Sequence, residues 1–188
     1  MASRSCSERG FSKTDPWGYL IGDEESAYDI SRRALNTVFR AYDGRGPRTV
    51  MTEKVLSRLS RARESSPPDA LPLIYGMSAT ELASLAPVVM EAAEEGDPAA
   101  LSVLVSCARD LVQMIVAVAK KLGLDSPPVA FTGGALKSRV YAGLVEEELS
   151  RTLPGATVTE CRYPPSVGAA IVAYKRRASR QNEGGHKA

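Results

Sequence analysis

The sequence has 188 residues, of which 44% are hydrophobic, 24% charged and 6% aromatic. This average globular mix excludes wholesale disorder, collagen-like chains and disulfide scaffolds. Lysine and arginine total 24 against 22 acidic residues. The resulting net charge of +2 creates no broad positive electrostatic field that would attract polyanions. We therefore expect neither nucleic acid nor a membrane among the partners.

The histidine and cysteine content narrows the chemistry further. The single histidine, His186, lies close to the C-terminus. The sequence therefore offers hardly any histidine for a Ser–His–Asp centre, a Cys–His centre or a zinc site. Cys6, Cys107 and Cys161 form no C-x-x-C motif, which predicts reduced thiols in a cytoplasmic protein. The first fifteen residues are polar and lack the apolar core of a secretory signal; we expect them to be disordered.

The predicted elements in the first half of the chain are all helical. Apolar residues recur at spacings of three and four, which is typical of one buried helical face. A charged, Ser/Pro-rich stretch at 61–69 predicts a surface loop. Single helices are predicted over 27–42, 52–59 and 68–76, and a pair of helices is predicted over 79–95, with a break at Pro87.

The clearest helix is predicted over residues 98–122. Asp97 is placed to cap its first amides, and Gly123 suits a left-handed exit. The stretch is apolar enough to resemble a membrane span, but Arg109 and Asp110 lie at its middle, where charges are costly in a bilayer. We therefore interpret it as a core helix.

The remaining elements alternate between strand and helix. We predict a buried strand at 128–132, a helix at 138–153, a strand at 156–161 and a helix at 165–180. Two strands joined by a crossover helix make a parallel pair, and parallel sheets normally contain more than two strands and are covered on both faces. We therefore expect part of this sheet to be missing from the sequence.

Residues 17–26 form the first segment that could carry chemistry. Asp23 and Glu24 precede a helix and could accept hydrogen bonds from vicinal sugar hydroxyls, while Trp17 could cover a sugar face. The structural alternative is that Ser26 and Asp29 cap the helix and that the acids favour its positive start. Both interpretations remain open from the residues alone.

The second segment is Thr132-Gly133-Gly134, directly after a predicted parallel strand. Backbone without side chains at the carboxyl edge of a sheet lets a nucleoside approach closely, although the same residues also suit an ordinary turn. No phosphate-loop motif occurs in the chain. Residues 164–170 are small and suit close helix packing, and the basic residues at 175–187 suit a solvated helix end, with a nucleic-acid contact or import signal as the alternative.

In order and spacing, these segments resemble the C-terminal half of the BadF/BadG/BcrA/BcrD ATPase family, which includes N-acetylglucosamine kinase. The Gly-Asp-Glu-x-Ser form at 22–26 is similar to the sugar-kinase branch. The resemblance implies an α/β, helix-rich lobe of an actin-like, ribonuclease H-like fold at 16–175, followed by a basic flexible tail at 176–188. The segments that carry it are 17–28, 40–47, 82–87, 96–98, 132–134 and 164–169.

The resemblance also implies a function, namely transfer of the γ-phosphoryl group of ATP to the 6-hydroxyl of an N-acetylhexosamine, with Mg²⁺. By position, the implied sugar-binding residues are Trp17, Gly18 and Asp23. The implied nucleotide-binding residues are Ala83, Thr132, Gly133 and Gly134. No catalytic residue and no Mg²⁺ ligand of the family maps to this chain.

Three departures from the family pattern limit what the resemblance implies. The chain begins after the point where the family has its phosphate loops and catalytic Asp, so we expect little activity unless an N-terminal lobe is supplied, by another chain or within a homo-oligomer. Glu25 stands where the family usually has Gly, and Pro16 replaces a glycine. The alternative hypothesis is therefore a non-catalytic nucleotide- or sugar-binding regulator with the same fold.

Overall fold

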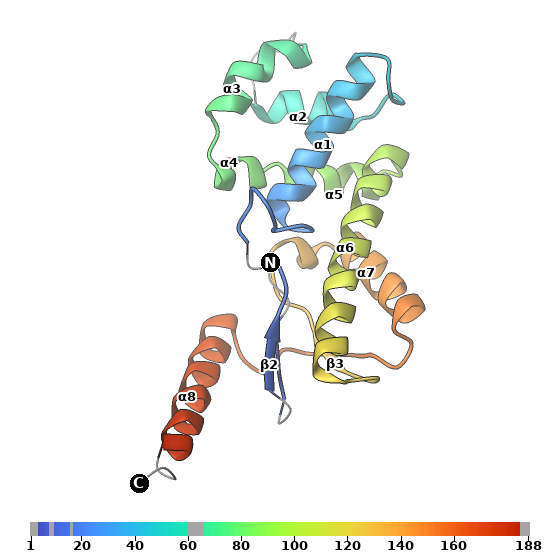
Figure 1. The fold of residues 1–188 in the computed structure, drawn as a ribbon. Coiled ribbons are helices and arrows are strands. Elements are labelled where there is room, and N and C mark those ends of the chain that lie inside the picture. The colour runs from blue at the N-terminus through green and yellow to red at the C-terminus, as the bar shows by residue number, and fades with distance from the viewer. Residues whose placement is uncertain (1–3, 8–9, 16, 60–65, 185–188) are drawn as a thin grey trace.

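The computed structural model describes residues 4–7, 10–15, 17–59 and 66–184 (Figure 1). The fold is a helix-rich α/β arrangement, as predicted. In chain order its elements are β1 Arg4–Ser7, β2 Gly10–Lys13, α1 Ala27–Tyr42, α2 Met51–Leu59, the 3-10 turn η1 Pro67–Ala70, α3 Leu71–Gly76, α4 Ala79–Ala83, α5 Ala86–Glu94, α6 Pro98–Leu122, β3 Pro128–Ala130, the 3-10 turn η2 Ala135–Lys137, α7 Arg139–Thr152, β4 Thr157–Thr159 and α8 Pro165–Gly184.

The helix predictions are confirmed, with small differences at two places. The predicted 68–76 helix is a 3-10 turn followed by α3, and η1 also takes the end of the predicted loop at 61–69, whose first part lies outside the described residues. The predicted pair of helices over 79–95 is present as α4 and α5, but the break lies at residues 84–85 instead of at Pro87. Pro87 lies in the first turn of α5, where its missing N–H costs no hydrogen bond, so the break falls just before it.

Helix α6 is the centre of the core and packs against α1, α5 and α7. Its ends are as predicted: the Asp97 carboxylate accepts a hydrogen bond from the Ala100 amide at 2.8 Å, and Gly123 adopts a left-handed φ of 62°. The second Asp97 oxygen accepts from the Val50 amide at 2.9 Å and so ties the start of α2 to α6. Although α6 is long and apolar enough to cross a membrane, half of its most apolar window is buried inside this fold.

A partly buried polar network fastens α1 to α6. The Arg33 guanidinium donates to Asp29 on its own helix and to Asp110 on α6, both at 2.7 Å. It also donates to the Ser106 hydroxyl at 2.6 Å. Asp29 is buried, so its charge must be compensated, and the Arg33 guanidinium does this at close range. Through its bond to Asp110, the same guanidinium fixes the position of the α1 N-terminus relative to α6.

Strands β3 and β4 pair in parallel, as predicted, with Val129 opposite Val158. The prediction of a buried sheet is wrong. All three residues of β4 are exposed, and among the described residues no further strand pairs with either edge. The strand sequence is apolar, but burial depends on what packs against the sheet. Of the two predicted strands, Val129, Phe131 and Ala156 pack partly against the helical core.

The two ends of the chain also differ from expectation. In the described part of the first fifteen residues, β1 and β2 form an antiparallel hairpin that contacts α6, a partner that local polarity could not reveal. At the other end, α8 continues to Gly184, so residues 176–184 of the predicted flexible tail are helical. The features predicted at Pro16 and His186 lie outside the described residues.

Candidate functional site

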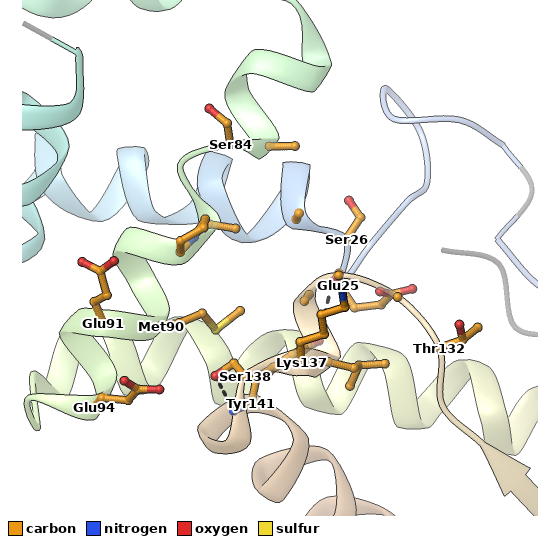
Figure 2. Close-up of a pocket in the computed structure, with 18 residues that line it drawn as sticks. Glu25, Ser26, Ser84, Met90, Glu91, Glu94, Thr132, Lys137, Ser138 and Tyr141 are labelled. Carbon is orange, nitrogen blue, oxygen red and sulfur yellow. Dashed lines mark hydrogen bonds between the residues drawn. The ribbon is translucent and has the colours of Figure 1, made fainter. Parts of the chain in front are cut away.

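A pocket of about 570 Å³ lies where the start of α1, the α4–α5 pair and the segment after β3 meet (Figure 2). This volume falls within the range of small-molecule sites, roughly 300–1,000 Å³. Most of its lining is apolar. The lining residues are Glu25, Ser26, Ala27, Ala83, Ser84, Ala86, Pro87, Met90, Glu91, Glu94, Thr132, Gly133, Gly134, Ala135, Leu136, Lys137, Ser138 and Tyr141.

One wall is bare backbone after strand β3. Gly133 has a φ of 136°, a conformation that side chains rarely adopt, and this turns the chain away from the strand. Gly134 has an ordinary helical φ of −66°, and a Cβ built on it meets nothing within 4 Å. The absence of a side chain at Gly134 therefore leaves open space at the pocket wall rather than relieving a clash.

The opposite wall comes from the junction of α4 and α5. The chain breaks between the two helices at Ser84 and Leu85, and the Leu85 side chain is buried in the core as an anchor. This anchoring places two small residues, Ala83 and Ala86, at the pocket. Small side chains on one wall and glycine backbone on the other leave a slot that suits a flat ring system.

The loop before α1 reaches the pocket through a strained backbone. Asp23 and Glu25 have left-handed φ values of 56° and 71°, a conformation that costs non-glycine residues about 1–2 kcal/mol each. The Asp15 carboxylate holds the loop by accepting a hydrogen bond from the Glu24 amide at 3.0 Å. A Cβ at Gly22 would lie 1.9 Å from an Asp15 oxygen, so any larger residue there would force the Asp15 side chain to move. Such strain is concentrated at functional sites in proteins.

Glu25 is an acidic residue in the wall of this mostly apolar pocket. It is only 5% exposed, and burial raises the pKa of its carboxyl to about 7, with a further contribution from the negative charges of Asp15 and Asp23. The Tyr141 hydroxyl donates to the Glu25 carbonyl at 3.4 Å, which connects the loop to α7. The Glu25 amide donates to Asp29 at the same distance. Glu25 is thus fixed between the pocket and the start of α1.

The predicted site residues fall into two groups. Ala83, Thr132, Gly133 and Gly134, the predicted nucleotide residues, converge on the pocket from segments about fifty residues apart in sequence. Trp17, Gly18 and Asp23, the predicted sugar residues, are not part of its lining; they lie on the loop that leads into it, and Trp17 is 69% exposed.

The structural interpretation of Ser26 is confirmed. Its hydroxyl accepts a hydrogen bond from the Asp29 amide at 3.2 Å and caps α1. Ser26 also lines the pocket, so the cap forms part of its wall. The capping role therefore accounts for the residue type at 26, while ligand binding by the neighbouring acids stays a prediction.

Sequence reasoning missed several residues of the pocket. Met90, Glu91 and Glu94 on α5 and Tyr141 on α7 carry no local motif, because these helices have the ordinary apolar spacing of packed helices. The helix break before Pro87 is the one local signal in the sequence that marks the start of α5, which lies at the pocket. The other residues are brought to the pocket by packing.

Metal and thiol chemistry find little support in the described residues. Within them, no group of three or more His, Cys, Asp or Glu side chains is placed to hold a metal ion. Burial raises the pKa of the Cys107 thiol to about 12, so it is an inert part of the core. Cys161 is exposed, and its sulfur lies 3.3 Å from the Phe131 carbonyl.

Two curated proteins are similar to this chain. The N-acetyl-D-glucosamine kinase of Dictyostelium discoideum is 33% identical over 164 residues, which are 84% of this chain and 50% of that protein. The N-acetylmuramic acid/N-acetylglucosamine kinase of Clostridium acetobutylicum is 31% identical over 164 residues, 84% of this chain and 52% of that protein. The chain therefore spans about half the length of the curated relatives it matches.

A solved structure and a family model extend the comparison. A crystal structure from Chromobacterium violaceum, provisionally named an N-acetylglucosamine kinase, matches 84% of this chain and 51% of that chain with a TM-score of 0.63 and 24% identity. This likeness shows the fold alone and, with the family match, supports the actin-like fold that the resemblance implied. The model of the BadF/BadG/BcrA/BcrD ATPase family matches residues 12–173. The chain belongs to the BadF/BadG/BcrA/BcrD ATPase family.

Proposed function

We propose that residues 16–175 form the nucleotide- and sugar-binding half of a cytoplasmic sugar kinase. Its reaction would be transfer of the γ-phosphoryl group of ATP to the 6-hydroxyl of an N-acetylhexosamine. The observation that carries this proposal is the convergence of Ala83 with Gly133 and Gly134 on one pocket. The names of the curated relatives support the choice of sugar.

The adenosine of ATP would lie in the slot between the two walls. The apolar surface of Ala83 and Ala86 would cover one face of the base, and the backbone at Gly133 and Gly134 would approach from the other side without steric conflict. In this arrangement the nucleotide is held mainly by shape and by exclusion of water.

The sugar would bind on the loop before α1. The Asp23 carboxylate can accept hydrogen bonds from sugar hydroxyls, and the exposed ring of Trp17 can cover an apolar sugar face. Asp23 comes two residues before Glu25, which lines the pocket, so the loop leads from the proposed sugar site to the nucleotide site. Its backbone geometry is set by Asp15, which binds the Glu24 amide.

Phosphoryl transfer needs parts that we do not assign to the described residues. The 6-hydroxyl oxygen attacks the γ-phosphorus while the bond to the β–γ bridging oxygen breaks, and a base accepts the hydroxyl proton. The resemblance puts that base, an Asp, in the other half of the relatives. Mg²⁺ would neutralise phosphate charge, and because no donor cluster for it lies in the described part, we assign it no ligands here. This half contributes binding and positioning.

Equilibrium binding of ATP tests the nucleotide site. Gly134→Phe places a ring in the open space of the pocket at a helical φ, so it blocks the slot without backbone strain. Gly143→Phe on α7 is the matched control, because a Cβ there also meets nothing within 4 Å and Gly143 lies outside the pocket lining. We expect ATP to bind to the wild type and to Gly143→Phe, and at least tenfold more weakly to Gly134→Phe. Equal binding by all three contradicts the proposal.

The alternative is a non-catalytic binding module of the same fold. It is favoured by Glu25, because a carboxylate in the pocket wall repels the phosphates of ATP. Phosphorylation of N-acetylglucosamine should be assayed with this chain alone and with the complementary half of a relative. Turnover in the combined assay supports the kinase, whereas nucleotide binding without turnover in either assay supports the module.

A further inference from the structure

The loop before α1 (residues 17–25), which carries the proposed sugar residues, becomes buried at its last position. Residues 17–24 are exposed or half-buried, whereas Glu25 is buried. The backbone of Asp23 and Glu25 is left-handed, a conformation that non-glycine residues rarely adopt. Such a conformation persists only where surrounding contacts impose it. The contacts that Glu25 makes with the rest of the protein therefore help to determine the position of Asp23.

One of these contacts comes from Tyr141 on α7, which lies 116 positions further along the chain. The Tyr141 hydroxyl donates a hydrogen bond to the Glu25 carbonyl at 3.4 Å, and both residues line the pocket (Figure 2). Burial raises the pKa of this hydroxyl above its ordinary value of 10. The hydroxyl therefore keeps its proton in neutral solution and acts as the donor.

The Tyr141 ring is fixed by the packing of α7. Tyr141, Val145 and Leu149 form the buried face of this helix, which packs against α6. The first turn is capped by Ser138, whose hydroxyl accepts a hydrogen bond from the Tyr141 amide at 3.4 Å. Helix α7 follows directly on η2 and on the glycine wall of the pocket. The Tyr141 hydroxyl therefore connects the loop to a rigid part of the pocket frame.

We propose that Tyr141 is a positioning residue for the sugar: by holding the Glu25 carbonyl, its hydroxyl keeps the Asp23 carboxylate in the geometry that receives sugar hydroxyls. This inference rests on the proposed function, because it takes the loop that carries Asp23 and Trp17 as the sugar site. A purely structural explanation is that a buried tyrosine hydroxyl needs an acceptor. That explanation predicts a change in stability alone, whereas positioning also predicts a change in the loop.

The first test observes the loop without any ligand. Trp17 is the single tryptophan of the chain and lies on this loop, so the anisotropy of its fluorescence reports the mobility of the loop. Tyr141→Phe removes the hydroxyl and keeps the ring. The matched control is Val145→Ala, which truncates the next buried residue of α7 and lowers stability outside the pocket lining. We expect a loss of anisotropy in Tyr141→Phe and the wild-type value in Val145→Ala.

The second test measures the binding of N-acetylglucosamine by titration calorimetry, at a temperature at which circular dichroism shows all three proteins to be folded. The hydrogen bond is longer than the usual O–H···O distance, so its loss should have a moderate effect. We expect the dissociation constant to rise about three- to tenfold in Tyr141→Phe. It should stay within about twofold of the wild type in Val145→Ala, because the loop keeps its contact.

The outcomes separate this inference from the proposed function. The inference is overturned if Tyr141→Phe leaves the anisotropy of Trp17 unchanged, or if Val145→Ala lowers it equally, because the loop would then respond to stability and not to the hydroxyl. It is also overturned if the wild type and Tyr141→Phe bind the sugar equally well. Absence of sugar binding by the wild type refutes the proposed sugar site together with the positioning role.

Discussion

Replacing Glu25 with Gln removes the ionisable group from the pocket wall and keeps its size. Burial raises the pKa of the Glu25 carboxyl from 4.5 to about 7, so the folded chain holds this proton over a pH range in which the unfolded chain has released it. The free energy of unfolding therefore receives its full contribution from this group below pH 4.5, and loses it as the pH rises through about 7.

The size of the effect follows from the same values. A pKa raised from 4.5 to about 7 corresponds to about 3 kcal/mol of stability lost between the two limits. Glu25 is almost fully buried, so screening by solvent reduces this figure little. A glutamine side chain has no proton to release, and the Glu25→Gln variant should therefore lack this part of the pH dependence.

Urea denaturation of the wild type and Glu25→Gln from pH 4 to pH 8 measures the effect. Stability of the variant relative to the wild type should rise by about 3 kcal/mol over that range, with most of the change between pH 5 and pH 7. Glu24→Gln, at the exposed neighbouring position, is the control and should show no such change. If the stability of Glu25→Gln relative to the wild type stays constant with pH, the inference that burial raises the pKa of the Glu25 carboxyl is refuted.

Two substitutions test the scaffold that positions the pocket. Asp97→Ala removes the acceptor of the Ala100 and Val50 amides, so urea denaturation should show a loss of about 1–2 kcal/mol. Gly155→Ala places a Cβ 2.6 Å from the Ser126 hydroxyl oxygen and 2.7 Å from a backbone carbonyl, so the loop before β4 must shift and stability should fall by about 1–3 kcal/mol. A free energy of unfolding that either change leaves unaltered would contradict the corresponding contact.

The elements that could be predicted are those whose ends are fixed by local chemistry. Asp97 and Gly123 determine the two ends of α6 through a side-chain cap and a left-handed residue, and both signals are present in the sequence itself. Burial of the β3–β4 sheet could not be predicted in this way, because Val158 is apolar in sequence but exposed in the fold. The burial of Val158 depends on which other segments pack against the sheet, and the sequence of the strand itself does not reveal them.

The residues of the candidate site also divide into those with a local signal in the sequence and those placed by tertiary packing. The glycines after β3 were identifiable because bare backbone at a strand end is a local feature. The positions of Tyr141 and Glu91 were not, since packing of α5 and α7 brings them to the pocket. The left-handed backbone of Asp23 and Glu25 was equally hidden, because the folded loop imposes it against the preference of both residue types.

The central claim is that an adenine nucleotide binds between the α4–α5 junction and the segment after β3. The most direct measurement is photolabelling of the full chain with a photoreactive azidoadenosine triphosphate, followed by peptide mapping. We predict labels within residues 83–94 and 132–141, the two walls of the pocket, and their loss on addition of unlabelled ATP. Labelling confined to other segments, or labelling that ATP does not reduce, would contradict the account.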